Sequence, residues 1–249
     1  MTKALLKQTP LPPRSLTISY PTMTKYISFR DFKTSPEITQ LAVILYVRFP
    51  LSLRNVEDLL HERGVDVSYE SVRYWWHRFG SQFANQIKRR RAGGMQASHW
   101  KWHLDEVFVK INGEKHYLWR AVDHEGEVLE SYVTKKRDKK AALKLMKKAM
   151  RRYGSPNEIV TDKLRSYSAA AKELDCADKQ VTERWANNRV ENSHLPFRRR
   201  ERAMLRFRRM HSLQKFASIH ASFYNLFNSQ RSLSKRSTFK LNRDAAITE

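Results

Sequence analysis

The spacing of apolar positions divides the chain into a helical first part and a mixed second part. From Ser35, apolar residues recur every three or four positions, as they do along one face of a helix. Ser35 followed by Pro36 is a typical helix start, because serine can accept a bond from a free backbone N–H and proline lacks that N–H. The pattern predicts three successive helices that begin near Ser35, Ser52 and Ser68, with Gly64 ending the second.

The third predicted helix, "YESVRYWWHRF" at 69–79, separates apolar from polar residues. Its inward side is formed by Val72, Trp75, Trp76 and Phe79. Two short helices joined by a glycine-containing turn, with polar side chains opening the second, are typical of a helix-turn-helix DNA-binding unit. In that unit the residues predicted to face the major groove are Tyr69, Glu70, Ser71, Arg73, Tyr74 and His77. An ordinary three-helix bundle that binds no DNA would show the same spacing.

Two segments outside these helices are predicted from their composition. Residues 1–30 hold four of the eight prolines and show no sustained period, which is typical of an extended or partly disordered arm. The segment "KRRRAGGMQASHW" (88–100) joins a basic run to two glycines and small polar residues, and this predicts a linker. We expect the cations of the run to contact DNA: Lys88, Arg89, Arg90 and Arg91.

Beyond residue 100 the apolar period changes to two, which predicts strands. The first strand, "HWKWHLDEVFVKI" (99–111), is followed by Asn112–Gly113, a strong hairpin signal, and by a returning strand at 114–122. A third strand is predicted at 127–134.

Helices and one more strand complete the second part of the chain. Asp138 is predicted to cap a helix that Gly154 ends, "NEIVTD" (157–162) predicts a short strand, and 163–174 looks helical. Antiparallel strands followed by alternating helix and strand predict a mixed α/β (α+β) sheet flanked by helices. The segment 212–230 predicts a helix that closes the sheet or, alternatively, forms a dimer face. Its apolar side comprises Leu213, Phe216, Ala217, His220, Phe223, Tyr224 and Phe227.

The net charge of the chain indicates which class of binding partner to expect. The 249 residues include 48 lysines and arginines against 25 acids, a net charge of +23. Such a surplus favours a nucleic-acid-binding protein over a ribosome-like or merely basic one.

The single cysteine, Cys176, excludes an internal disulfide framework and argues against a cysteine-rich zinc site. The longest apolar run, 41–47, is too short to cross a bilayer, and the N-terminus lacks a signal core. We therefore expect a soluble, cytoplasmic protein.

Two aspartates stand at positions where apolar strands need no acid. Asp105 lies within the first strand, and burying an unpaired charge there would cost several kcal/mol. By alternation Asp105 and Glu106 point to opposite faces, so one of them faces the core or a cleft. Asp162 ends a later strand, where ligands collect in α/β sheets, although it would also serve as the N-cap of the following helix. Lys163 and Arg165 beside it would be free to face phosphates.

An arginine-rich segment follows a third acid, Glu191. Seven arginines and one glutamate lie between residues 198 and 209, and the fork of arginine suits phosphate. We expect Arg199, Arg200 and Arg202 to contact DNA. Arg198 lies nearly two helical turns beyond Glu191, unless Pro196 kinks or restarts the helix between them.

Three blocks, "HLDEVFVKINGEKHYLWRAVD", "IVTDK" and "NNRVENSHLPFR", resemble the acidic blocks of DDE-type transposases. The resemblance is to bacterial insertion-sequence family six, spans roughly residues 35–225, and departs at Trp119, where tyrosine is common. It implies a helix-turn-helix ahead of an RNase H-like core. It also implies a catalytic and metal-binding triad of Asp105, Asp162 and Glu191, with Arg198 as its basic partner.

The resemblance further implies how such an enzyme works. The three acids would hold two Mg²⁺ ions, for which Mn²⁺ can substitute, and these ions would promote in-line displacement at phosphorus. Cleavage would free a 3′-OH at the element end, and strand transfer would join it to target DNA, giving replicative cointegrates. A homo-oligomer would hold two ends in a synaptic complex at the bacterial nucleoid.

The predicted division of the chain is an arm (1–30), a helix-turn-helix domain (31–92), an RNase H-like catalytic domain (96–230) and a basic tail (231–249). Two other functions stay open from the residues alone. A non-catalytic helix-turn-helix regulator would keep every activity when its acids are replaced. An RNase H-type nuclease would cleave RNA–DNA hybrids without its helix-turn-helix.

Overall fold

The computed structural model describes residues 32–94, 101–183, 187–204, 207–228 and 235–248. The predicted arm at 1–30 therefore lies outside the described residues. Within the described ranges, no helix is both long enough and apolar enough to span a membrane.

The helical first part forms as predicted. Its three helices are α1 (Pro36–Arg48), α2 (Leu53–His61) and α3 (Tyr69–Gly94). Each start is capped by the expected serine: Ser35 accepts from the N–H of Ile38, Ser52 shares a capping box with Asn55, and Ser68 accepts from the N–H of Ser71. The inward side of α3 is buried, from Val72 onward.

The predicted linker at 88–100 is wrong for its first part, because residues 88–94 continue α3. The reason lies in the buried face of the helix, which extends past Phe79 through Phe83 and Ala84 to Ile87. Lysine and arginine also have good helix propensity, so a basic run at the end of an apolar face prolongs a helix. The predicted boundary between the domains thus falls inside the last turn of α3.

The second part contains one five-stranded sheet with the order β3-β2-β1-β4-β5. Its strands are β1 (Lys101–Ile111), β2 (Glu114–Asp123), β3 (Val128–Thr134), β4 (Glu158–Thr161) and β5 (Gln180–Val181). The first three strands are antiparallel neighbours, whereas β4 runs parallel to β1 and β5 runs parallel to β4. Asn112 and Gly113 make the predicted hairpin turn with positive φ angles of 49° and 85°. The predicted mixed sheet is confirmed.

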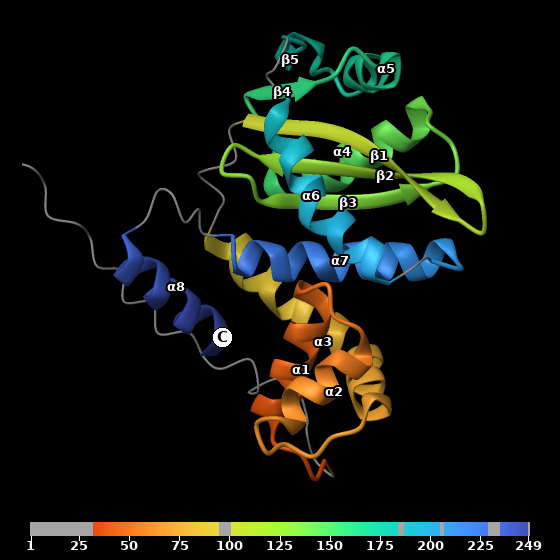
Figure 1. Cartoon of the computed structure of the whole chain (residues 1–249). Coiled ribbons are helices and arrows are strands. Elements are labelled where there is room, and N and C mark those ends of the chain that lie inside the picture. Colours follow the sequence, from red (N-terminus) through yellow and green to blue (C-terminus); the bar gives the residue numbers. More distant parts are fainter. Residues whose placement is uncertain (1–31, 95–100, 184–186, 205–206, 229–234, 249) are drawn as a thin grey trace, which may run out of the picture.

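Helices cover both faces of the sheet. One face packs against α4 (Lys139–Tyr153) and α5 (Arg165–Glu173), which the short 3-10 helix η2 (Ala177–Lys179) follows. The other face carries α6 (Asn188–Ala203) and α7 (Met210–Leu226). Figure 1 shows α6 crossing the sheet and α7 lying between the sheet and α1–α3.

The apolar side of α7 is buried, as predicted for a helix that closes the sheet, and it serves two partners. It contacts β3 on one side and both α1 and α3 on the other. A single core therefore runs from the helices into the sheet, joining Trp76 and Phe79 of α3 to Phe216 of α7 and Val109 of β1. The segment predicted as a basic tail contains a further helix, α8 (Arg236–Thr248).

Candidate active site

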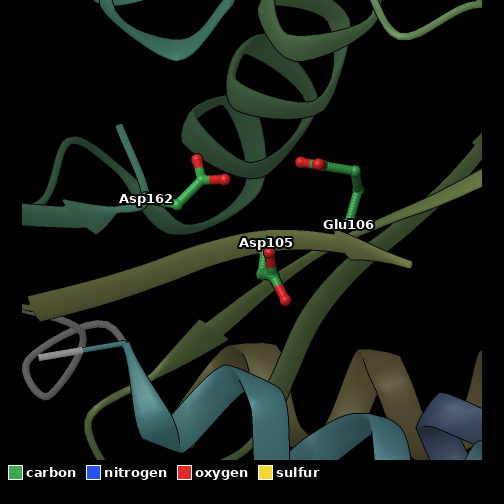
Figure 2. A group of neighbouring side chains, drawn as sticks. All are labelled: Asp105, Glu106 and Asp162. Carbon is green, nitrogen blue, oxygen red and sulfur yellow. The ribbon is translucent and has the colours of Figure 1, made fainter. Parts of the chain in front are cut away.

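The parallel pairing of β1 with β4 brings Asp105 and Asp162 together. The last pair in that register is Leu104 with Thr161, and each aspartate is the next residue along the chain. Oxygen atoms of Asp105, Glu106 and Asp162 all lie within 4.8 Å of one another. Figure 2 shows Glu106 and Asp162 extending toward each other beside β1, with Asp105 on the strand itself.

The alternative that Asp162 caps the following helix is wrong, because the N-cap residue of α5 is Leu164 and Asp162 lies two residues earlier. Its Oδ1 accepts the N–H of Leu164 at 3.1 Å, which supports the turn into α5. Its Oδ2 lies 3.5 Å from the guanidinium of Arg137. The side chain of Asp162 is 39% exposed, so the carboxylate cluster is open to solvent at this residue.

Asp105 extends toward α6, where its Oδ2 lies 3.3 Å from Nε2 of His194. Burial, and after it the nearby charges of Arg120 and Arg198, lower the pKa of His194 to about 2. The imidazole is therefore neutral and does not compensate the charge of Asp105. Burial, together with the charge of Asp162, raises the pKa of Asp105 to about 6.

Glu106 lies on the opposite face and is held by two partners. It accepts a bond from the hydroxyl of Tyr167 at 2.9 Å and another from Nε of Arg137 at 2.6 Å. Burial nevertheless raises its pKa to about 7. Because Arg137 also reaches Asp162, one guanidinium bridges the two acids across the cluster.

Glu191, the third acid of the predicted triad, is exposed on α6 and is not one of the three clustered carboxylates. Its neighbours on that helix are nevertheless fixed to β1. Asn187 donates to the carbonyl of Leu104 at 2.9 Å, and His194 contacts Asp105. Since spacings of four and three residues share one helix face, Glu191 lies on the side of α6 that carries these contacts.

Arg198 lies farther along β1 than the cluster. Its guanidinium donates to the carbonyl of Phe108 and, at 2.7 Å, to Glu201. The helix does not break between Glu191 and Arg198, because α6 runs continuously through Pro196. The role of Arg198 as a partner of the triad stays a prediction.

The residues predicted to contact DNA fall into exposed and buried groups. On the first turns of α3, Arg73, Tyr74 and His77 are exposed, while Tyr69 and Ser71 are partly covered. Lys163 and Arg165 are exposed next to Asp162, Arg199 and Arg202 are exposed on α6, and Arg89 is exposed on α3. Arg90 is half-buried, and the side chain of Arg91 lies outside the described part. These DNA contacts stay predictions.

Two members of that set are directed into the protein. Arg200 is 1% exposed and donates from Nε to the carbonyl of Tyr46 at 2.7 Å, so the prediction that it contacts DNA is wrong. The arginine-rich pattern does not distinguish this side chain, because burial on α6 follows from packing against α1. Lys88 lines a small pocket with Glu127 and Tyr153, where burial lowers its pKa.

Several residues of the site were not identified from the sequence. Arg120 is fully buried opposite Asp105 in the β1–β2 register and donates to the carbonyl of Ser193 at 2.6 Å, which ties β2 to α6. A lone arginine inside the apolar strand "YLWRAV" was an available signal, as was the Asn187, Glu191, His194 spacing. Arg137 and Tyr167 gave no local signal, because only the fold brings them to Glu106.

The donor set fits a hard divalent cation. All the clustered ligand atoms are carboxylate oxygens, which such ions prefer, and burial raises the pKa values of Asp105 and Glu106, which favours their protonated forms when no metal is bound. Both oxygens of Glu106 already have partners, which leaves Asp105 and Asp162 as the freer ligands. The arrangement can therefore hold a metal between β1 and β4.

Comparison with known proteins gives the family. A model described as a DDE domain matches residues 99–230, just over half of the chain. The transposase for insertion sequence-like element IS431mec of Staphylococcus aureus is 30% identical over 174 residues, which cover 68% of this chain and 75% of that protein. The transposase for insertion sequence element IS257 in transposon Tn4003 of the same species matches with the same identity and coverage.

Solved structures show partial similarity. The catalytic core domain of HTLV-2 integrase in complex with magnesium is 20% identical, with a TM-score of 0.41, and the match covers 53% of this chain and 89% of that one. The Mos1 transposase catalytic domain is 16% identical with a TM-score of 0.38, covering 67% and 92%. On the family model and the two staphylococcal relatives, this chain belongs to the DDE-domain transposases of bacterial insertion-sequence family six.

Proposed function

We propose that the chain binds the terminal inverted repeats of a mobile element and carries out metal-dependent strand cleavage and strand transfer. The observation that carries this proposal is the register of β1 and β4, which sets Asp105 beside Asp162. Membership in the DDE transposase family supports the reaction class.

The third metal ligand in this proposal is Glu191. Glu106 is adjacent to Asp105, but Arg137 and Tyr167 already bind its carboxylate. Glu191 is exposed and shares a helix face with Asn187 and His194, both of which contact β1 at Leu104 and Asp105. In this proposal, metal binding draws the carboxylate of Glu191 to the cluster.

The metal site in this proposal holds two Mg²⁺ ions, for which Mn²⁺ can substitute. When bound, such ions activate the attacking oxygen and stabilise the leaving oxygen at phosphorus. The chain itself holds and orients the reactants. The exposed cations Lys163 and Arg165 are placed next to Asp162, where they would hold DNA phosphates against the site.

The wider steps of the proposed function rest on the family resemblance. Hydrolysis would free a 3′-OH, and attack of this 3′-OH on target DNA would give a replicative cointegrate. Synapsis of two ends requires at least two protomers, so we propose a homo-oligomer that acts at the nucleoid. The exposed side of α3, with Arg73, Tyr74 and His77, would recognise the repeats.

The test is cleavage of supercoiled DNA that carries the element ends, with Mg²⁺ or with EDTA. We expect the wild-type chain to nick the ends only when metal is present, and Glu191→Ala to lose this nicking. Asp178→Ala is the matched control, because Asp178 is an exposed acid on η2, outside the cluster. Equal activity of Glu191→Ala and wild type would reject the triad.

A regulator that only binds DNA is the second candidate, and the basic, exposed face of α3 favours it. One experimental result distinguishes such a regulator from a transposase. Replacing Asp105, Asp162 or Glu191 would then leave DNA binding and every other activity unchanged.

A further inference from the structure

A groove lies between the helix-turn-helix and the helix that closes the sheet. Its volume is about 480 Å³. One wall is α3, with Arg73, Trp76 and His77. The other wall is the start of α7 and the residues just before it, with Arg208, His211, Ser212, Lys215 and Phe216. We call this feature the α3–α7 groove.

The α3–α7 groove has an aromatic floor and a basic rim. Tyr46, Trp76, Phe207 and Phe216 are each at most 9% exposed, so they form the floor. Arg73, Arg208 and His211 are exposed around them, and Lys215 is half-buried. Arg73 of α3 is paired with Glu70 at 3.0 Å, whereas Arg208 and Lys215 stand on the α7 wall.

The cations on the α7 wall are not neutralised by nearby acids in the part of the chain that the structure describes. Among the described residues, no carboxylate forms an ion pair with Arg208, His211 or Lys215. The ammonium of Lys215 instead donates to the carbonyl of His77 at 3.2 Å, which joins the two walls. Burial lowers the pKa of His77, and the charges of Lys215 and Arg73 lower it further. The lowered pKa favours the neutral form of His77, so the positive charge of the groove that lacks an acidic partner lies on the α7 wall.

The N-terminal end of α7 adds to the positive electrostatic potential of the groove. Arg209 stands at its N-cap position without a side-chain bond to the first turn, so the free N–H groups there are not capped by that side chain. The helix dipole places partial positive charge at this end, next to His211 and Ser212. Anionic groups are the ligands that such an end favours.

We propose that the α3–α7 groove binds the sugar–phosphate backbone of duplex DNA where it passes from the helix-turn-helix toward the catalytic sheet. This proposal rests on the proposed function as a transposase. A backbone strand fits better than an unstacked base, because the aromatic floor is buried and the ammonium of Lys215 covers the ring of Trp76 at 5.8 Å. Arg208 and Lys215 on the α7 wall, which have no acidic partner among the described residues, suit a linear polyanion.

Binding of DNA in the groove would set the position of the DNA end. Because α7 packs against β3 on its other side, a strand held by both walls would fix the recognised end relative to the carboxylate cluster. The α7 wall of the groove would then orient DNA without reading its sequence, since phosphate contacts position a duplex and base contacts specify it.

The first experiment compares two charge reversals in the full-length chain. Arg208→Glu with Lys215→Glu changes the groove, and Lys140→Glu with Arg151→Glu makes the same change on α4, on the other face of the sheet. Fluorescent duplexes from the element ends and of random sequence are titrated over a range of salt concentrations. We expect the groove pair to weaken both duplexes at least tenfold and to reduce the log–log salt slope by about 2. Equal effects of the two pairs, or none, would overturn the proposal.

A second experiment does not depend on charge-reversed variants. Cys176 is 2% exposed, so the chain has a low background for thiol chemistry. Ser212→Cys is exposed in the groove, and Lys140→Cys is the control on α4. With duplex DNA that carries a mixed disulfide tethered to a backbone phosphate, we expect thiol–disulfide exchange, with release of the small thiol, to crosslink the DNA only through position 212. Crosslinking at both positions alike, or only at 140, would reject the groove as a DNA site.

The outcomes separate this proposal from the proposed function. If wild type cleaves element ends with Mg²⁺ but the groove variants bind and cleave normally, only the groove proposal fails. If Ser212→Cys crosslinks through position 212 but the wild-type chain never cleaves, the proposed catalytic function fails and the groove remains a DNA-binding site.

Discussion

Arg137 bridges Glu106 and Asp162, so a residue from the loop before α4 connects the two sides of the carboxylate cluster. Its Nε donates to Glu106 at 2.6 Å, and its guanidinium lies 3.5 Å from Asp162. Tyr167 holds the other oxygen of Glu106. Glu106 therefore acts as an anchor that holds the guanidinium of Arg137 next to the proposed metal ligands.

The first prediction concerns this anchor. In Glu106→Gln the charge that holds Arg137 is lost, and we expect metal-dependent cleavage or metal affinity to fall about 10- to 100-fold, as for other residues that orient metal ligands. The measurement is the cleavage rate over a Mg²⁺ titration. Glu114→Gln is the control, because Glu114 is exposed in the β1–β2 hairpin and pairs with Lys135. If both variants titrate like wild type, Glu106 does not position the site.

The second prediction concerns the attachment of α6 to β1. Asn187→Leu removes the donor to the carbonyl of Leu104 and leaves that buried acceptor unpaired, which typically costs about 1–3 kcal/mol. We expect a lower free energy of unfolding in urea. We also expect a weaker response to Mg²⁺, because Glu191 would be less well positioned. A variant that loses stability but keeps the wild-type Mg²⁺ titration would show that this bond does not serve the site.

The third prediction uses two adjacent arginines with opposite environments. Arg200 is 1% exposed and packs over the ring of Tyr46, whereas Arg199 is exposed. Arg200→Ala should lower the free energy of unfolding by about 1.5–3 kcal/mol, because a charged hydrogen bond to Tyr46 is lost. Arg199→Ala should leave stability nearly unchanged and weaken DNA binding. Chemical denaturation and duplex titration of both variants check this, and a reversed pattern would contradict it.

The fourth prediction concerns pH. Burial raises the pKa of Asp105 from 3.8 to about 6 and that of Glu106 from 4.5 to about 7. Between pH of about 4 and about 7 the folded chain holds protons that the unfolded chain has released, so metal-free stability should fall as pH rises through this window. A divalent cation competes with these protons and should stabilise the chain more at higher pH.

The stabilisation of the chain by a divalent cation can be measured as the difference in Tm between samples with Mg²⁺ and samples with EDTA, at pH of about 5 and of about 8. The shift should be larger at the higher pH. Asp105→Asn should abolish it at both, which separates the site from general effects of acid. An equal shift at both pH values would argue that these carboxyls do not titrate with the metal.

The elements set by short-range contacts could be predicted from the amino-acid sequence. Ser35, Ser52 and Asp138 cap helices through bonds to residues three positions away, and Asn112–Gly113 turns the hairpin because glycine tolerates positive φ. Such contacts depend on near neighbours, so they appear in the local pattern. Asp105 and Asp162 were also recognisable, because each is an acid in or after an apolar strand.

Only the tertiary structure decided which side chains meet. Tyr167 reaches Glu106 because α5 packs on β1, and Arg200 is buried because α6 lies against α1. The extent of α3 likewise depends on α7, which covers the apolar face that continues to Ile87. These outcomes depend on contacts between residues distant along the chain, and local periodicity carries no information about partners that folding brings together.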